Sequence, residues 1–194
     1  DLELPLALKA GGELSGFAVN VRGLGFSYSP TSPMLFRGAE LGVDSKSRIV
    51  LLGENGNGKT TLIRSGLSAC FRDPDDGADA PVCFLPLGGA CGASTLVGHA
   101  YTYAGSTWGR IVDGLMNARC MNPILCFDEL DKVSKGPLGQ EVIGVLTHLT
   151  DPTQNDRWYD RYFDGVPLDL SKALMVFTFN DRSAVDPVLL DRIT

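Results

Sequence analysis

The chain has 194 residues, enough for one domain with a sizeable hydrophobic core. Hydrophobic residues make up 44% and charged residues 21%, which is ordinary for a globular protein, and no apolar run approaches the roughly 20 residues that a membrane-spanning helix needs. The formal net charge of −6 argues against a broad surface for nucleic acid or anionic lipid, so we expect no membrane and no direct nucleic-acid partner.

The N-terminus and the cysteines bear on the compartment. Residues 1–4 (DLEL) have neither an initiator Met nor the basic start of a signal peptide, which predicts a fragment or a processed product. Five cysteines, an odd number without metal-type spacing, predict reduced thiols. We therefore expect an intracellular protein, cytoplasmic or in the mitochondrial matrix, that is not secreted.

The predicted organisation is a short tail followed by one domain. Residues 1–16 form the expected tail, and residues 17–194 form the expected single domain. Apolar residues alternate over 17–28 as they do in a strand, and a second strand is expected from residue 35 to 41. The apolar stretch 48–52 predicts a short buried strand.

The stretch GENGNGKT that follows this strand fits the phosphate-loop pattern of a glycine, four residues and then glycine-lysine-threonine. The first turns of a helix are expected at 61–67. Glycines let the loop direct its N–H groups at phosphate oxygens, and the helix N-terminus adds its positive end. Lys59 would meet the β- and γ-phosphates of ATP, and the Thr60 hydroxyl would bind Mg²⁺. The expected nucleotide-binding residues are Gly53, Glu54, Asn55, Gly56, Asn57, Gly58, Lys59, Thr60 and Thr61.

A second apolar strand, at 123–127, delivers Asp128 and Glu129 at its end. An Asp at a strand end beside a phosphate loop holds Mg²⁺ through water, and an adjacent Glu polarises the attacking water. Asp128 and Thr60 are therefore the predicted Mg²⁺ ligands, and Glu129 is a predicted catalytic residue. An Asp-Glu pair alone is usually a solvated helix start, but the buried strand before it and the phosphate loop upstream favour catalysis.

A further apolar strand, 173–179, ends in Asn180, and apolar residues recur with helical spacing over 108–120 and 139–149. Alternating strands and helices predict a mainly parallel sheet with helices on both faces, which is the three-layer α/β sandwich of a P-loop NTPase. The phosphate loop, Glu129 and Asn180 are expected together at the carboxyl ends of the strands.

The N-terminal part resembles one known family. The segments FSY (26–28), LF (35–36) and DSKSRIVLLG (44–53) look like the start of an ABC-type nucleotide-binding domain, in particular of the ABC-F group, over residues 17–70. The resemblance implies that Tyr28 stacks on adenine, and a strand aromatic in the core is the alternative. No glutamine loop, no correctly placed LSGGQ and no ABC-style Walker B motif follow.

The remainder of the chain resembles another family. Motifs follow one another in order over about residues 82–194: FLPLGG (84–89), GHAYTYAGS (98–106), GRIV (109–112), NPILCFDELDK (122–132), THLTDPTQN (147–155), DLSK (169–172) and LLDR (189–192). Together they look like the AAA+ module of Lon-type ATP-dependent proteases and are similar to the Lon-like ATPases of large DNA viruses and protists.

This second resemblance implies roles for three residues. Asn180 would be sensor 1, which orients water near the γ-phosphate, and a turn former is the alternative. Arg192 would be a finger that reaches a neighbouring subunit's nucleotide, which implies a homo-oligomer; a helix-end arginine paired with Asp191 is the alternative. Tyr103 would be a pore-loop aromatic that grips an unfolded polypeptide, and a core tyrosine is the alternative.

The patterns together predict an AAA+-like ATPase that binds ATP and Mg²⁺, hydrolyses the γ-phosphate and does conformational work on a polypeptide. From that resemblance we expect residues 1–194 to lack the family's helical lid, its sensor 2 arginine and a protease site. One alternative is an ABC-F-like ATPase acting on the ribosome, which needs the missing LSGGQ motif. The other is a non-hydrolysing nucleotide-binding assembly protein, which Glu129 argues against.

Overall fold

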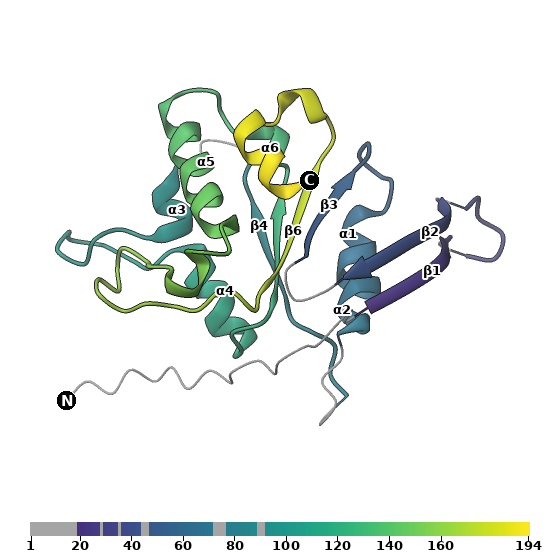
Figure 1. Cartoon of the computed structure of the whole chain (residues 1–194), viewed down its shortest axis with the longest axis horizontal. Coiled ribbons are helices and arrows are strands. Elements are labelled where there is room, and N and C mark those ends of the chain that lie inside the picture. The colour runs from purple at the N-terminus through teal and green to yellow at the C-terminus, as the bar shows by residue number, and fades with distance from the viewer. Residues whose placement is uncertain (1–18, 28, 35, 44–46, 72–76, 89–91) are drawn as a thin grey trace.

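The computed structural model describes residues 19–27, 29–34, 36–43, 47–71, 77–88 and 92–194. Two sheets lie within them: an antiparallel hairpin and a four-stranded sheet (Figure 1). Tyr28, the predicted adenine contact, lies outside the described residues. Among the described residues, no helix combines the length and the apolarity needed to cross a membrane.

The four-stranded sheet is entirely parallel, as the alternation of strands and helices predicts. Its strands are short and apolar because a parallel sheet is covered on both faces. In spatial order they are β3 (Arg48–Leu52), β6 (Leu174–Phe179), β5 (Ile124–Asp128) and β4 (Val82–Pro86). The strand that leads into the phosphate loop is thus separated from the strand that ends in Asp128 by β6 alone.

Helices cover both faces of this sheet, with α3 and α5 on one side and α1 and α2 on the other (Figure 1). On the first side are α3 (Ala93–Val97), α4 (Arg110–Ala118), α5 (Pro137–Thr150) and α6 (Pro187–Ile193). On the second side, one helical run comprises α1 (Lys59–Thr61), the π-helical η1 (Leu62–Leu67) and α2 (Ser68–Cys70). The 3₁₀ turns are η2 (Leu130–Lys132), η3 (Asn155–Arg157) and η4 (Arg182–Ala184).

The residues of β5 show why the fold has three layers. Strand side chains alternate between the two faces of a sheet. Ile124 and Cys126 are fully buried against Ile63 and Leu67 of the helical run that follows the phosphate loop. Leu125 and its alternate neighbour Phe127 pack instead into the larger core beneath α3, α4 and α5. The predicted α/β sandwich of a P-loop NTPase is confirmed.

A pair of stacked rings anchors the centre of the sheet. Phe127 of β5 and Phe177 of β6 lie opposite each other, with ring centroids 5.1 Å apart and planes 16° from parallel. Both side chains are fully buried. Removing either ring would cost about 3–5 kcal/mol of folding free energy. The pair fixes the two strands at the positions directly before Asp128 and Thr178.

The hairpin consists of β1 (Val19–Phe26) and β2 (Phe36–Val43), which correspond to the two predicted N-terminal strands. It extends sideways from the molecule beside α1 and α2 (Figure 1). Val43 at its end is fully buried and belongs to the smaller core with Ile49 and Ile63. The hairpin therefore packs on the layer that carries the phosphate loop.

Candidate nucleotide-binding site

The register of the parallel strands brings the predicted site residues to one edge of the sheet. Leu52 lies opposite Phe179, which places Gly53 beside Asn180. Phe127 lies opposite Phe177, which places Asp128 beside Thr178 in the same way. Because all four strands are parallel, their carboxyl ends lie at the same edge of the sheet, and these residues lie there together.

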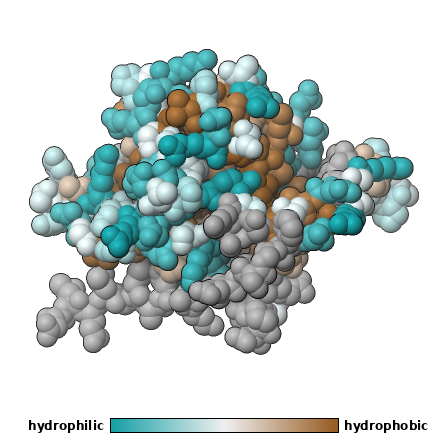
Figure 2. Space-filling model, viewed as in Figure 1, coloured by the Kyte–Doolittle hydropathy of each residue, from teal (hydrophilic) through white to brown (hydrophobic). Residues whose placement is uncertain are grey.

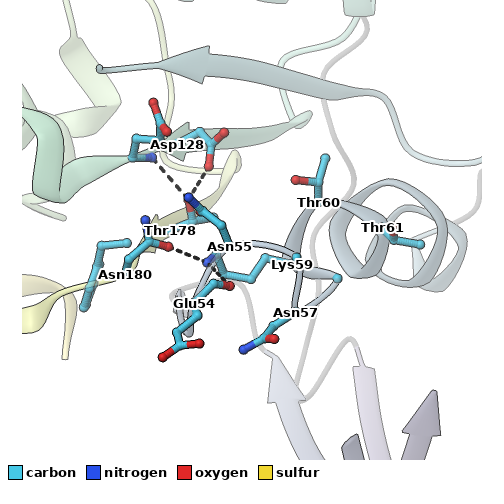
Figure 3. Close-up of a pocket in the computed structure, with 13 residues that line it drawn as sticks. Glu54, Asn55, Asn57, Lys59, Thr60, Thr61, Asp128, Thr178 and Asn180 are labelled. Atoms are coloured by element: carbon cyan, nitrogen blue, oxygen red, sulfur yellow. Dashed lines mark hydrogen bonds between the residues drawn. The ribbon is translucent and has the colours of Figure 1, made fainter. Parts of the chain in front are cut away.

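A cavity of about 200 Å³ occupies this edge. Its lining consists of most of the phosphate loop and the residues that end β5 and β6: Glu54, Asn55, Gly56, Asn57, Gly58, Lys59, Thr60, Thr61, Asp128, Glu129, Thr178, Phe179 and Asn180. Figure 3 shows Lys59 reaching from the loop toward Asn180 while Asp128 meets Thr178 nearby. The sequence predicted this grouping of the loop with Asp128, Glu129 and Asn180.

The backbone of the phosphate loop needs its glycines. Gly56 has φ of 86° and Gly58 has φ of 76°, a left-handed conformation that side chains rarely adopt. Among the described residues, the N–H groups of Asn55, Gly56 and Gly58 have no hydrogen-bond acceptor, although Asn57 bonds back within the loop. Unpaired N–H groups beside a helix N-terminus form an anion site.

The Lys59 ammonium lies across the loop rather than in solvent. Its Nζ donates hydrogen bonds to the carbonyl oxygen of Gly53, to that of Glu54 at 3.2 Å and to Asn180 Oδ1 at 2.8 Å. All three acceptors are neutral, so within the described part of the chain no carboxylate balances this charge. The unbalanced charge makes the cavity suitable for an anion such as a phosphate.

Thr178 connects the two acidic residues at the end of β5. Its Oγ1 donates to Asp128 Oδ1 and accepts the backbone N–H of Glu129 at 3.2 Å. The residue is only 2% exposed, so this hydroxyl is a buried polar group with both partners supplied. Sequence reasoning missed Thr178, and the available signal was a single hydroxyl in the otherwise apolar stretch 173–179.

Glu129 has an unusual backbone conformation. Its φ of 60° and ψ of 48° place a non-glycine residue in the left-handed region, which costs roughly 1–3 kcal/mol and turns the side chain out of the strand direction. The carboxylate then lies against Gly88, where an added Cβ would be only 2.5 Å from Glu129 Oε2. The neighbouring Leu87 holds Gly88 close to Glu129, because the Leu87 N–H donates to the Asp128 carbonyl at 2.9 Å. Gly88 is thus a second site residue that sequence reasoning missed.

The oxygen donors of the cavity fit Mg²⁺. Thr60 presents an exposed hydroxyl to the cavity, and Asp128 keeps one carboxylate oxygen that Thr178 does not occupy. Mg²⁺ prefers hard oxygen ligands and keeps several waters or phosphate oxygens. In the described residues no group of three or more His, Cys, Asp or Glu could hold a metal, so a cation here would depend on few protein ligands. That is the usual pattern for Mg²⁺ bound with a nucleotide.

Arg192 lies on α6, outside the lining of the cavity. Its Nη1 is 3.2 Å from Asp151 Oδ2, so its partner is Asp151 and not Asp191 as the alternative prediction had it. Hydrogen bonds from Thr153, and then the pairing with Arg192, lower the pKa of Asp151 to about 2. The arginine is 40% exposed, and its role as a finger stays a prediction.

Tyr103 lies in an outward loop, residues 98–109, that does not line the cavity. The tyrosine is 70% exposed and its neighbour Tyr101 is 63% exposed, so the alternative of a core tyrosine is wrong. The loop closes at its base, where the His99 N–H donates to the Thr107 carbonyl at 3.1 Å. An exposed aromatic side chain on a closed loop is available to contact another molecule.

The parallel sheet, the glycine loop and the acidic strand end define a phosphate-loop NTPase domain. The particular family follows from comparison with known proteins. The model of the AAA family, "ATPase family associated with various cellular activities", matches residues 49–194. The chain belongs to this family.

Proteins whose sequences are similar to this chain include Lon proteases. A Lon protease homolog of Acanthamoeba polyphaga mimivirus is 38% identical over 152 residues, 77% of this chain and 14% of the relative. A Lon protease of Campylobacter concisus is 36% identical over 81% of this chain and 18% of the relative. A peroxisomal Lon protease homolog 2 of Danio rerio is 37% identical over 75% of this chain and 16% of the relative. The chain spans less than a fifth of the length of these relatives.

These comparisons correct the interpretation of the N-terminal part. The predicted ABC-F resemblance over residues 17–70 has no support, because the AAA match begins at residue 49 and includes the whole phosphate loop. A likeness that covers 77% of the chain also extends well before residue 82, where the Lon-like part was expected to begin. The short phosphate-loop motif is shared by many NTPases and does not by itself identify a family.

Proposed function

We propose that this chain binds Mg-ATP in the cavity beside β3, β5 and β6 and hydrolyses its γ-phosphate. The observation that carries the proposal is that Lys59, Asp128, Glu129 and Asn180 line one cavity, which is the combination of a lysine, two acids and a polar side chain that phosphoryl transfer uses. The AAA family match and the similarity to Lon proteases support it.

Binding would use the backbone first. The N–H groups of Asn55, Gly56 and Gly58 would donate to phosphate oxygens. Lys59 would exchange its neutral acceptors for the β- and γ-phosphates, a stronger charge-assisted interaction. Thr60 and Asp128 would hold Mg²⁺, which neutralises charge that develops on the phosphate oxygens.

Hydrolysis would depend on Glu129 and Asn180. A water oxygen attacks the γ-phosphorus while the bond to the β–γ bridging oxygen breaks, so the products are ADP and inorganic phosphate. Glu129 would polarise this water and accept its proton, and Asn180 would hold the water or the γ-phosphate after losing its bond to Lys59. Gly88 leaves the space in which the Glu129 carboxylate lies.

The hydrolysis cycle would act on a polypeptide in an assembly of several copies. Tyr103 is exposed on its loop and would contact an extended chain through its ring. Arg192 lies away from its own cavity, which is what a residue serving a neighbour's nucleotide needs. We propose no proteolysis by residues 1–194, and we propose residues 17–194 as one functional unit.

The test separates nucleotide binding from turnover. The substitution Glu129→Gln keeps the size of the side chain and removes its ability to accept a proton. We expect ATP affinity, measured by titration calorimetry, to change less than about threefold and Mg-dependent turnover to fall roughly 10²–10³-fold.

The control is Glu141→Gln, which makes the same change at an exposed position of α5. It should keep wild-type turnover. Full turnover in Glu129→Gln would overturn the proposal. ATP binding without turnover in the wild type would favour the non-hydrolysing assembly protein instead.

A further inference from the structure

Asp160 is a buried carboxylate that the nucleotide site does not use. It lies between η3 and β6, is only 1% exposed and does not line the cavity. Its two oxygens accept two backbone N–H groups: Oδ2 that of Gly109 at 2.8 Å and Oδ1 that of Tyr162 at 2.8 Å. Burial raises the pKa of this carboxyl, and the backbone hydrogen bonds from Gly109, Tyr162 and Phe163 act in the opposite direction. Burying a carboxyl costs free energy unless it is hydrogen-bonded, so these backbone N–H groups offset the cost of placing Asp160 here.

The carboxylate fills the base of the loop that carries Tyr103. Gly98, at one end of loop 98–109, has φ of 72°, and a Cβ there would lie 2.8 Å from Asp160 Oδ1 and 2.8 Å from the nitrogen of Gly109. Gly109, at the other end, would bring its Cβ within 2.0 Å of the Leu96 carbonyl oxygen. Neither end has room for a side chain: at Gly98 the Asp160 carboxylate and backbone atoms of the loop occupy the space, and at Gly109 the backbone of Leu96 and Gly98 does.

Two further contacts join the loop to the segment 158–168. The Arg161 N–H donates to the Val97 carbonyl at 2.7 Å, directly before the loop. Trp108, within the loop, meets the ring of Tyr162 edge-on at 5.8 Å and stacks on that of Phe163 at 6.1 Å. Segment 158–168 leads through the fully buried Leu170 into β6, the strand that carries the site residues at its end.

We propose that Asp160 is a positioning residue that holds the Tyr103 loop on segment 158–168, so that the two move as one body when a polypeptide is bound. This rests on the proposed contact between Tyr103 and a polypeptide. Asp160 touches neither nucleotide nor polypeptide in this account. It acts on polypeptide binding through the backbone of Gly109 and Tyr162.

The test compares Asp160→Asn with Asp164→Asn, an exposed position of the same segment. The Asn amide retains one acceptor but presents its NH₂ group to the other backbone N–H. We expect amide hydrogen exchange across residues 98–109 to accelerate roughly tenfold or more, the equivalent of losing one hydrogen bond. Affinity for a fluorescent unfolded casein should fall about tenfold, and ATP affinity should stay within about twofold. Asp164→Asn should leave all three unchanged.

Unchanged exchange over 98–109 in Asp160→Asn would overturn the proposal, and so would an equal loss of ATP and casein affinity, which marks a general structural role. If the variant fails to fold, exchange in the wild type decides. The amides of Gly109 and Tyr162 must then be far slower than that of Tyr101 at the exposed tip, and equal rates overturn the proposal. Accelerated exchange in the variant, with no casein binding even by the wild type, supports the Asp160 contact and overturns the role of Tyr103.

Discussion

Two glycine-containing loops of this protein differ in what they present. The phosphate loop, residues 53–60, turns toward a cavity and offers backbone N–H groups and one lysine. The Tyr103 loop, residues 98–109, turns outward and offers exposed aromatic side chains. In the first loop glycines create the binding geometry, whereas in the second the glycines at each end permit close packing, Gly98 against Asp160 and Gly109 against the Leu96 backbone.

The surface of the molecule is mixed in hydropathy. In Figure 2, hydrophilic residues cover much of the visible face, and a hydrophobic area shows near α6 and β3. Leu52, at the end of β3, is 55% exposed, and Val188 of α6 is 62% exposed. Exposed apolar residues of this kind are ordinary when scattered, so they carry no functional argument here.

The largest expected effect is on the phosphate loop itself. Lys59→Ala removes the side chain that links the Glu54 carbonyl to Asn180 and that would meet the phosphates. We expect ATP turnover to fall by roughly 10²–10³-fold and ATP affinity to weaken as well. Coupled-enzyme turnover and calorimetry measure both. Lys135→Ala, an exposed lysine outside the cavity, is the control and should match the wild type.

The second expected effect tests the supporting residues of the phosphate site. Gly88→Ala places a Cβ only 2.5 Å from the present position of Glu129 Oε2. The carboxylate must shift, and a displacement of about 1 Å at a reacting group costs up to roughly 10²-fold in rate. ATP affinity should persist. Gly144→Ala on α5 has open space around its Cβ and should have no effect. Equal turnover in the two variants would show that the position of Glu129 does not matter.

The third effect concerns the hydroxyl between the two acids. Thr178→Val has the same shape but leaves Asp128 and the Glu129 N–H without their shared partner. We expect turnover to fall roughly tenfold and folding stability to drop by about 1–3 kcal/mol. Thr178→Ser restores the hydroxyl and should recover most of the turnover. A serine variant as impaired as the valine variant would mean that packing, not the hydroxyl, is what matters.

The smallest effect should come from the outward loop. Tyr103→Ala removes one exposed ring, and such contacts are worth roughly 0.5–1.5 kcal/mol beyond their buried area. The affinity for a fluorescent unfolded casein, measured by anisotropy, should fall about three- to tenfold. Tyr159→Ala removes another exposed tyrosine, 49% exposed, and serves as the control. A uniform loss in both variants would indicate nonspecific aromatic contact rather than a role of Tyr103.

The sequence predicts the phosphate-loop site well because each of its motifs is a short continuous stretch of sequence. A glycine pattern, an apolar strand and an acidic pair each have one common structural meaning, and parallel strands must bring their carboxyl ends together. Thr178 and Gly88 escape such reasoning because their importance arises from register across strands distant in sequence. The register, which pairs Pro86 with Asp128, is known only once the strand order is known.

The outward loop is harder to predict for the same physical reason. Nothing near Tyr103 in the sequence indicates that the loop is held by Asp160, more than 50 residues later. The partner of Arg192 was also missed, because Asp151 is distant in sequence whereas Asp191 is adjacent. The ABC-F resemblance has no support for a different reason: it depends on short segments around a motif that many NTPases share, and the AAA match includes that motif.

The most direct test of the account is ATP turnover against protein concentration, for the wild type and for an equal mixture of Glu129→Gln and Arg192→Ala. If each cavity uses its own Glu129 and a neighbour's Arg192, turnover per molecule must rise with concentration. The two variants, each inactive alone, must regain part of the wild-type turnover when mixed, because some cavities then combine an intact glutamate with an intact arginine. Turnover per molecule that stays constant over the dilution series, with no gain on mixing, would contradict the account.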